Sequence, residues 1–409
     1  MNNIKTRFQE KELNKLYGKY RVILKWATGC GKSKATIDLI NYAVDKYHKK
    51  VVKVLFVVAE RAHIKNWQDE MFKWNLKIDK VATDVICYAS LHKMENADYD
   101  IIVFDEAHHV FTKKRLNIIR TLKAKYVFLL SATLSKNKTF EIEGIYGRFT
   151  VSTVTLKDAI DSDILPDPRV YLIGLELDNS IPNQKIVIGG KDVKGPVISW
   201  EKRTKYIFKN YSCVIRCTQR QKYLYYTDTM EYWKRRYEYS HSNFHHNRWV
   251  NTGSMRKRFL GELKTRYVRR LLLTIPEDKR FVCFCASVAQ AEAIAKDKTI
   301  SSKRATKANQ AIIDSFNAKQ LNQIFAVGMI TEGMNLTDIQ AGIIVQLDGK
   351  ERLFVQKFGR SMRAQDPVSF IFYYKDTQDE VYLKNALENI DKKYIRHITN
   401  INHLNNIKL

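Results

Sequence analysis

The sequence of 409 residues contains few cysteines and no long hydrophobic run. Its six cysteines are scattered through a large chain, a pattern typical of reduced thiols and not of a disulfide framework. No stretch of 18 or more apolar residues occurs, which argues against a membrane-spanning helix. The first seven residues lack the apolar core of a signal peptide. These absences predict a cytoplasmic protein without a membrane partner.

Two pairs of cysteines have spacings that resemble halves of a zinc site. They are Cys213 with Cys217, and Cys283 with Cys285. Each pair lies inside an apolar, strand-like run, and no histidine cluster is spaced to complete a four-ligand site. We therefore expect no zinc here and interpret these cysteines as ordinary reduced thiols.

Acidic residues are scarce relative to basic ones. The chain has 70 Lys and Arg against 43 Asp and Glu, which gives a net charge of +27. Such an excess favours nucleic acid or another anionic surface as the partner, without choosing between DNA, RNA and membrane. The hydrophobic content of 45% is ordinary for a soluble globular protein, and the length suits two or three domains.

Short apolar runs alternate with helical patterns, which predicts an α/β fold with mostly parallel sheets covered by helices. The expected strands of the first half are 22–25, 51–58, 85–88, 101–104 and 126–130. Those of the second half are 281–285, 324–327, 343–347 and 369–374. Two such series imply two α/β domains. The clearest break between them is at Pro166 and Pro168, because two prolines in three residues cannot continue a helix.

The stretch between these series has a different composition. Its first part, with two glycine-containing turns near 189 and 195, predicts a loop or hairpin. Residues 218–275 predict helices dense in aromatic and basic residues. The aromatic residues of 223–249 could stack on bases while the arginines hold phosphates. Alternatively they form the core of a small helical subdomain, and we expect this for most of them because helices need buried aromatics.

The most informative segment is the glycine loop at 27–33, which directly follows the apolar run 22–24 and precedes a helical pattern. Glycines let backbone N–H groups close on phosphates, and a helix N-terminus adds a positive dipole end. We expect a polyphosphate to be held by Thr28, Gly29, Cys30, Gly31, Lys32 and Ser33. Lys32 would reach the β- and γ-phosphates, and the Ser33 hydroxyl would hold Mg²⁺. The alternative is a glycine-rich turn with a solvated lysine.

Two carboxylates follow the apolar run 101–104 at once. Asp105 and Glu106 are thereby predicted at the C-terminal edge of a buried strand, where ligands bind in open α/β sheets. Asp105 would contact the Mg²⁺ shell, and Glu106 would orient and deprotonate the attacking water. The alternative is a strand that ends in a polar helix cap.

Two further segments carry weaker signals. Ser131 and Thr133 follow the strand 126–130, but such hydroxyl residues also commonly cap helices. Arg360 and Arg363 are three residues apart and share one face of a predicted helix. Guanidinium groups from a second domain could stabilise charge on a transferring γ-phosphoryl group. A solvated basic helix is the alternative for this segment.

Taken in order, these residues resemble the motif set of superfamily 2 helicases, in the compact DEAH form of phage and restriction-system motors. Residues 27–33 resemble motif I in a shorter variant, because Trp26 stands where the full pattern has glycine. Residues 105–108 resemble motif II, 131–133 motif III, 331–336 motif V and 356–363 motif VI, while 58–67, 88–91 and 281–287 are similar to the connecting motifs. Asn335 departs from the aspartate that many members carry.

The resemblance implies two tandem RecA-like domains with parallel sheets and a helical basic, aromatic insert. The boundaries would be 1–162 for the first domain, 163–180 for a linker, 181–275 for the insert and 276–409 for the second domain. ATP and Mg²⁺ would be bound by the first domain, and residues of the second domain would complete the site. The resemblance assigns to this site the further residues Gln356, Arg360, Arg363, Gly333 and Asn335. Gln356 would link the nucleotide cleft to the nucleic-acid surface.

The resulting expectation is a monomeric ATP hydrolase that moves on DNA, in the cytoplasm of a bacterial or phage-infected cell. Three alternatives stay open. The chain could be an RNA helicase, or the motor subunit of a larger restriction or defence complex without unwinding of its own. It could also be a binding protein with a vestigial P-loop, which the intact set of Lys32, Ser33, Asp105 and Glu106 argues against.

Overall fold

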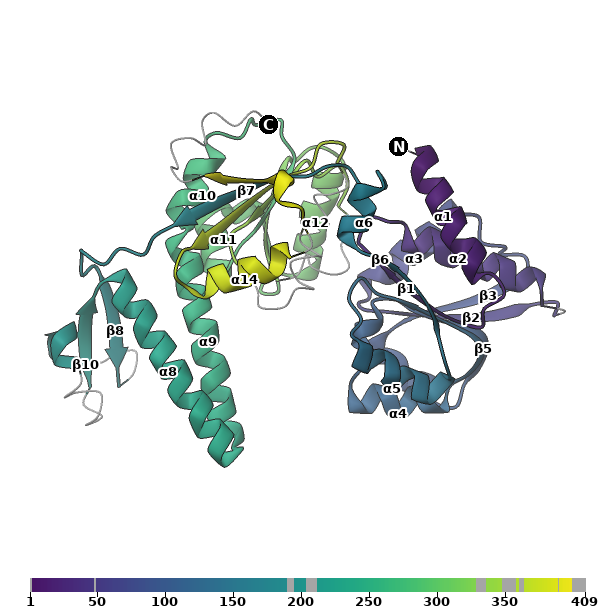
Figure 1. Ribbon diagram of the computed structural model, residues 1–409, viewed down its shortest axis with the longest axis horizontal. Helices are drawn as coiled ribbons and strands as arrows, with labels where there is room; N and C mark the ends of the chain where they lie inside the picture. Colours follow the sequence, from purple (N-terminus) through teal and green to yellow (C-terminus); the bar gives the residue numbers. More distant parts are fainter. Residues whose placement is uncertain are drawn as a thin grey trace.

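The computed structural model describes residues 2–47, 49–189, 195–203, 212–328, 336–347, 358–359, 364–388 and 390–398. This part of the chain forms two α/β lobes, and a long helical hairpin projects from the second (Figure 1). The first lobe comprises residues 2–161, and the second comprises 169–175 and 264–398. None of the described helices has the length and hydrophobicity needed to cross a bilayer.

The first lobe contains a six-stranded, fully parallel sheet in the order β3-β2-β4-β5-β1-β6. Its strands are β1 (Arg21–Trp26), β2 (Val52–Val58), β3 (Val81–Cys87), β4 (Asp98–Phe104), β5 (Lys123–Leu130) and β6 (Thr150–Val154). The helices are α1 (Asn2–Leu16), α2 (Lys32–Asp45), α3 (Ala62–Lys73), α4 (Lys113–Thr121), α5 (Lys136–Tyr146) and α6 (Leu156–Asp161), with 3₁₀ turns at Tyr88–Met94 and Ala107–His109.

Alternate residues of each strand face opposite layers of helices, so the sheet is buried on both sides. Val22 and Leu24 of β1 pack in the same hydrophobic cluster as residues of α1, α2 and α3. Ile23, between them, packs with residues of α4 and α5 on the other face. The five strands expected in this half are confirmed. The edge strand β6 was not predicted, because its sequence alternates Thr, Ser and Val and contains no continuous apolar run.

The second lobe contains a seven-stranded parallel sheet in the order β12-β13-β11-β14-β15-β7-β16. Its strands are β7 (Arg169–Leu175), β11 (Phe281–Phe284), β12 (Thr299–Ser301), β13 (Gln323–Val327), β14 (Ala341–Ile344), β15 (Val368–Tyr374) and β16 (Ile395–Ile398). The helices are α10 (Thr265–Leu272), α11 (Val288–Ala295), α12 (Thr306–Asn317) and α14 (Gln378–Leu387), with 3₁₀ turns at Lys296–Lys298 and Lys392–Tyr394. The four strands predicted for this half are present.

The expected linker at 163–180 is wrong in its central part. Residues 169–175 form β7, which pairs with β15 on one side and β16 on the other. Val170, Leu172 and Ile173 are buried in this position, so the strand completes the hydrophobic layers of the second sheet. The second lobe therefore begins before the insert, and not at residue 276.

The insert combines a small sheet with the helical hairpin. Strands β8 (Gln184–Ile188), β9 (Val197–Ser199) and β10 (Cys213–Cys217) form a three-stranded sheet in the order β8-β10-β9. A 3₁₀ turn follows at Trp200–Lys202, and the hairpin consists of α8 (Gln219–Ser240) and α9 (Asn243–Leu263). Cys213 and Cys217 lie in the core of this sheet, while Cys283 and Cys285 lie in the core of the second lobe.

The aromatic residues of 223–249 mostly do not form a core, contrary to our expectation. Only Tyr223 is buried, whereas Tyr232, Tyr239 and Phe244 are exposed. The reason is geometric, because no third element among the described residues packs against the rings of the distal part of the hairpin. Figure 1 shows this part standing away from the second lobe.

Candidate nucleotide site

The glycine loop lies between β1 and α2, as the sequence predicts. Gly29 and Gly31 have φ of 94° and 88°, a left-handed conformation that side chains with a Cβ rarely adopt. α2 begins at Lys32 without a side-chain cap at its N-terminus, so its first N–H groups are directed to the loop. The ammonium of Lys32 donates to the carbonyl of Trp26 over 2.9 Å. The loop thus presents backbone donors and a lysine at one end of the sheet.

Two side chains of α1 hold this loop by hydrogen bonds to its carbonyl groups, which the sequence did not predict. The Gln9 amide donates to the carbonyl of Cys30 over 2.9 Å, and the Lys5 ammonium donates to that of Gly29 over 2.6 Å. Gln9 is only 2% exposed. A Cβ at Gly31 would lie 2.0 Å from the Gln9 amide nitrogen, so this contact also requires glycine there. A lone glutamine in an amphipathic helix carries no signal for such a contact.

Asp105 stands at the C-terminal end of β4, beside the loop. Its Oδ2 accepts a hydrogen bond from the Trp67 indole over 2.9 Å, and its Oδ1 accepts from the Glu106 N–H over 2.9 Å. Burial, followed by the neighbouring charge of Glu106, raises the pKa of Asp105. The Trp67 hydrogen bond and the nearby charges of His63 and Lys32 oppose this rise. Asp105 and Lys32 are therefore close enough to interact electrostatically, although β4 and β1 are separated by β5.

Glu106 has a backbone conformation that is rare for a residue other than glycine. Its φ of 44° is left-handed, and the 3₁₀ turn Ala107–His109 follows at once. Its Oε2 lies 3.3 Å from Nδ1 of the buried His108. Such strain persists only where surrounding structure enforces it, and it is common at functional sites. Here the Glu106 carboxylate lies beside His108, while Asp105 is held by Trp67 and by the Glu106 N–H.

Ser131 and Thr133 follow β5 at the same edge of the sheet. The N–H of Ser131 donates to the carbonyl of Leu24 over 3.2 Å, and the Ser131 hydroxyl accepts from the N–H of Thr133. Ser131 is fully buried. The segment is therefore held directly beside the strand that leads into the phosphate loop.

The second lobe reaches the phosphate loop through Gly359. A Cβ at Gly359 would lie 2.7 Å from the Cβ of Thr28, so a larger residue here would force the Thr28 side chain or its surroundings to shift. Phe358 is buried in the same cluster as Ala27 and Cys30. The other residues expected here, Gln356, Arg360, Arg363, Gly333 and Asn335, lie outside the described part of the chain. Their roles stay predictions.

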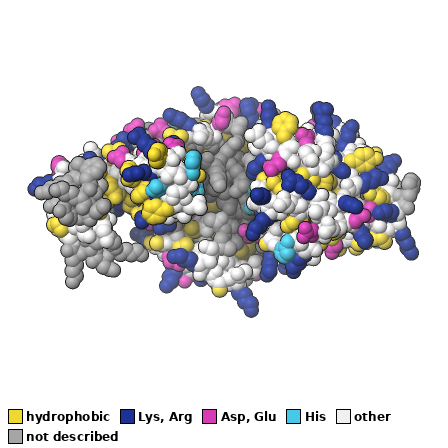
Figure 2. Space-filling model, turned by 90° about the horizontal axis from the view of Figure 1, so that it is seen from below, with side chains coloured by type: hydrophobic (Ala, Val, Ile, Leu, Met, Phe, Trp, Pro, Cys, Tyr) yellow, Lys and Arg dark blue, Asp and Glu magenta, His cyan; other side chains and the backbone are white. Residues whose placement is uncertain are grey.

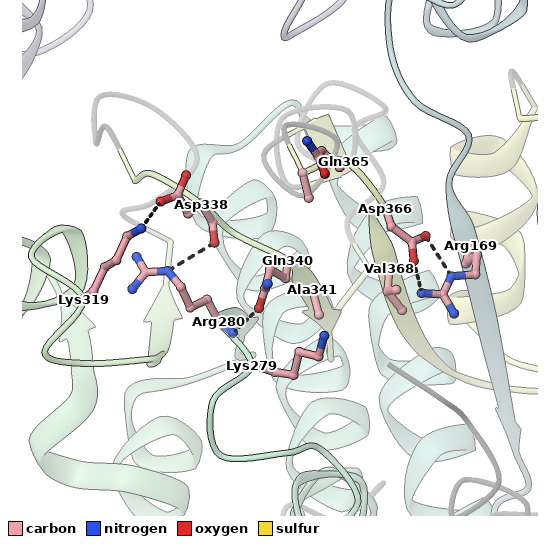
Figure 3. A pocket seen from close by; sticks show the side chains of 11 residues that line it. Arg169, Lys279, Arg280, Lys319, Asp338, Gln340, Ala341, Gln365, Asp366 and Val368 are labelled. Carbon is pink, nitrogen blue, oxygen red and sulfur yellow. Dashed lines mark hydrogen bonds and ion pairs between the residues drawn. The ribbon is translucent and has the colours of Figure 1, made fainter. Parts of the chain in front are cut away.

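A separate cavity lies at the opposite end of the second sheet, where its strands begin (Figure 3). It has a volume of about 510 Å³, and Arg280 lies on its wall. The Arg280 guanidinium is nearly buried and donates to the carbonyls of Phe316 and Thr337 over 2.7 and 3.1 Å. The guanidinium also lies over the aromatic ring of Phe316, 4.0 Å from the ring centre. Arg280 thus ties α12 and the segment before β14 to β11, which is a structural role.

Two family models match the chain. The model of the type III restriction enzyme res subunit matches residues 1–136, which include the phosphate loop and Asp105. The model of the helicase conserved C-terminal domain matches residues 263–365, which include Gly359. The chain belongs to superfamily 2 of the helicases, the class of nucleic-acid helicases and translocases. Among curated protein sequences, none matches this chain.

Solved structures share the arrangement of both lobes. The helicase domain of Pyrococcus furiosus Hef has a TM-score of 0.51 and 14% identity, over 92% of this chain and 96% of that chain. S. cerevisiae Dbp5 bound to RNA and ADP BeF3 has a TM-score of 0.57 and 11% identity, over 97% of this chain and 90% of that chain. The ATP-dependent type ISP restriction-modification enzyme LlaBIII bound to DNA has a TM-score of 0.56 and 13% identity. The match covers 97% of this chain and 31% of the LlaBIII chain. These likenesses confirm the two predicted RecA-like domains.

Proposed function

We propose that this chain is a motor that couples ATP hydrolysis to movement on nucleic acid, with DNA as its track. The observation that carries the proposal is the close approach of Gly359 to Thr28. A nucleotide on the phosphate loop would lie where the two lobes meet, so its binding and hydrolysis would change their relative position.

The described residues of the first lobe fit a nucleoside triphosphate with magnesium. Two glycines with left-handed φ and the uncapped start of α2 provide the backbone donors that phosphates require. When bound, magnesium neutralises charge on the phosphate oxygens. Ser33 and Asp105 would hold it, since hydroxyl and carboxylate oxygens are its preferred ligands. Lys32, which now donates to a backbone carbonyl, would instead contact the β- and γ-phosphates.

Glu106 would supply the base for hydrolysis. As the oxygen of a water molecule attacks the γ-phosphorus, the Glu106 carboxylate accepts the proton of that water, and ADP leaves with the electron pair of the broken bond. Arg360 and Arg363 from the second lobe would neutralise the charge on the transferred group, and Gln356 would couple the cleft to the nucleic-acid surface.

The net charge of +27 supports a nucleic-acid track, and the choice of DNA is supported by the type III restriction model that matches the first lobe. LlaBIII, which is described as bound to DNA, has a similar fold. A second candidate is the motor subunit of a larger complex, because this chain covers only 31% of LlaBIII. Size measurement in solution tests for such a partner.

The experiment that tests the proposal is ATPase turnover with and without nucleic acid. We expect single-stranded DNA to stimulate turnover, and Lys32→Ala or Glu106→Gln to reduce it at least about 100-fold at an unchanged melting temperature. Lys34→Ala is the matched control, because Lys34 lies in the first turn of α2 in an ion pair with Asp38. Turnover that is indifferent to single-stranded, forked and four-way DNA and to matched RNA would refute the motor.

A further inference from the structure

The helical hairpin carries a surface that the nucleotide site does not use. Its helices α8 and α9 have 22 and 21 residues, which corresponds to a length of about 30 Å. His241 has a left-handed φ of 50°, and the Ser242 hydroxyl caps the start of α9, so the two helices reverse direction within two residues. We define residues 230–250 as the hairpin tip.

Aromatic rings gather at the hairpin tip without being buried. Trp233 of α8 packs edge-on against Phe244 of α9 at 6.0 Å, and Tyr237 stacks on Trp249 at 6.0 Å. Tyr239 is 89% exposed and Phe244 is 56% exposed. The rings of 232–249 belong to none of the hydrophobic clusters of the described residues. Hydrophobic burial therefore does not account for their number.

Guanidinium groups lie over these rings. Arg248 lies 5.3 Å from the ring centre of Phe244, and Arg236 lies 5.5 Å from that of Tyr232. The tip contains four Lys and Arg against two Glu, and three histidines besides. Figure 2, which views the molecule from below, shows hydrophobic, basic and His side chains intermixed where the hairpin points toward the viewer. Exposed rings with attached positive charge suit a ligand that has both flat bases and phosphates.

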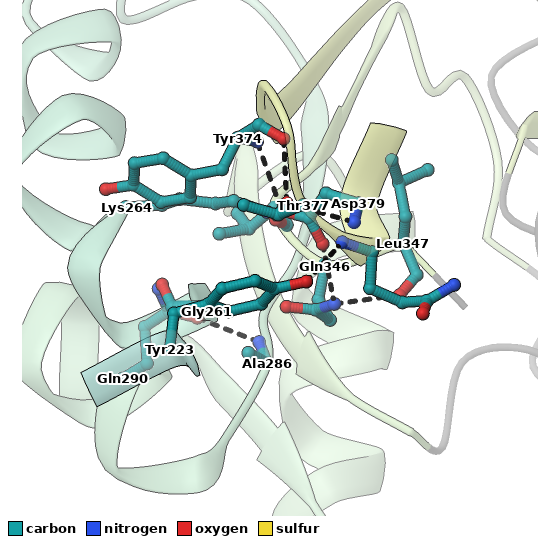
Figure 4. A network of polar contacts seen from close by, with 12 residues as sticks. Tyr223, Gly261, Lys264, Ala286, Gln290, Gln346, Leu347, Tyr374, Thr377 and Asp379 are labelled. Carbon is teal, nitrogen blue, oxygen red and sulfur yellow. Dashed lines mark hydrogen bonds and ion pairs between the residues drawn. The ribbon is translucent and has the colours of Figure 1, made fainter. Parts of the chain in front are cut away.

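The base of the hairpin is fixed to the second lobe by buried polar contacts (Figure 4). Lys264, at the end of α9, forms an ion pair with Asp379 of α14 over 2.6 Å, and both side chains are buried. The Lys264 ammonium also donates to the carbonyl of Val345, which follows β14. A Cβ at Gly261 would lie 2.1 Å from that of Ala286, so the close packing of α9 on the lobe requires glycine at this position.

Two contacts on α8 and α9 extend this attachment. The Tyr223 hydroxyl accepts from the N–H of Gln378, and Arg256 donates to the Gln378 side chain over 3.1 Å. The hairpin is thereby held at its base from both helices while its tip remains in solvent. The tip must follow any movement of the second lobe.

We propose that the hairpin tip binds unpaired nucleotides at the junction between duplex and single strand, by stacking of Tyr239 and Phe244 on bases. This inference rests on the proposed function for the identity of the track. Bases at a junction expose ring faces that a continuous duplex conceals, and a rigid, projecting pair of helices can reach such a face. Arg248 and Arg236 then contact the flanking phosphates.

The test compares the tip variant Tyr239→Ala/Phe244→Ala with the control Phe72→Ala/Phe140→Ala. The control residues lie in the first lobe and are also highly exposed, at 84% and 70%. Affinity is measured by fluorescence anisotropy without ATP, on forked and on blunt DNA and on matched RNA forks. We expect the tip variant to lose about 10- to 100-fold in affinity for forks and to retain its affinity for blunt duplex, at an unchanged melting temperature.

Arg248→Ala adds a second readout. Loss of one phosphate contact should reduce the slope of the logarithm of the fork-binding constant against the logarithm of salt concentration by about 1. Equal fork affinity of the tip variant and the wild type would overturn the inference, and so would the same loss in the control. Binding without ATP separates this result from the motor proposal. If the wild type binds forks through the tip but no nucleic acid stimulates its ATPase, the proposed function fails and the tip assignment stands.

Discussion

Asp105 is held in a balance between opposing influences. Burial and the Glu106 charge raise its pKa, whereas the hydrogen bond from Trp67 lowers it. In the proposed site Asp105 would bind magnesium as the ionised carboxylate, so protonation would compete with metal binding. Trp67 also packs against Phe56 at 4.9 Å, which fixes the indole in the geometry that the hydrogen bond needs.

Trp67→Phe should therefore shift the pH dependence of ATP hydrolysis. Without the indole donor the pKa of Asp105 rises further, so a higher pH is needed to ionise it, and the acidic limb of kcat/KM moves to higher pH. We expect a loss of kcat/KM that is larger at low pH than at high pH. Trp74→Phe is the control, because its indole donates to Glu70 and not to Asp105. A uniform loss at every pH would show that Trp67 acts only through packing.

The same residues show where prediction from sequence ends. Residues 27–33 and 105–106 were located because loop, strand and helix patterns are local in the sequence. Gln9 and Trp67 were not, because each contacts the site from another helix, and one glutamine or tryptophan in an amphipathic pattern indicates only an ordinary helix. The left-handed conformation of Glu106 was equally invisible, since it is imposed by the packing around it.

Among the elements, the hairpin is fixed at its base by a fully buried ion pair between Lys264 and Asp379. Breaking one partner of a buried pair leaves an uncompensated charge, which costs about 3–5 kcal/mol. Lys264→Met should therefore destabilise the second lobe strongly, while Lys264→Met/Asp379→Asn should recover much of the loss, because the substituted amide would carry no charge and still accept hydrogen bonds.

Urea unfolding measures both variants, and Lys234→Met on the exposed part of α8 serves as control, with an expected change within about 0.5 kcal/mol. A double variant that is less stable than the single one would contradict this account of the pair.

The helices and strands themselves were predicted unevenly from the sequence. Continuous apolar runs identified the central strands, whereas β6 and β7 required knowledge of their neighbours in the sheets.

For the whole molecule, the close approach of Gly359 to Thr28 is one described feature that joins the lobes. Gly359→Ala adds a methyl group 2.7 Å from the Thr28 Cβ, so the Thr28 side chain or the lobes must shift to accommodate it. We expect at least about a tenfold loss of kcat with little change in nucleotide affinity, because in the proposed mechanism binding uses the first lobe and hydrolysis uses both.

Nucleotide affinity and single-turnover ATPase separate these two effects. Gly144→Ala is a suitable control, since no atom lies within 4 Å of a Cβ placed at this glycine of α5. If Gly359→Ala hydrolyses ATP at the wild-type rate, the close approach of the lobes is not needed for catalysis.

The position of β7 also has a consequence for how the chain is made. This strand leaves the ribosome before the insert, yet both of its sheet neighbours, β15 and β16, come near the end of the chain. At a synthesis rate of about 5–20 residues per second, the roughly 200 residues between β7 and β15 take about 10–40 s to appear. During this interval the apolar strand has no partner in its sheet. The first lobe can fold as it emerges, but the second must wait for the last strands, which makes late synthesis the vulnerable stage for aggregation.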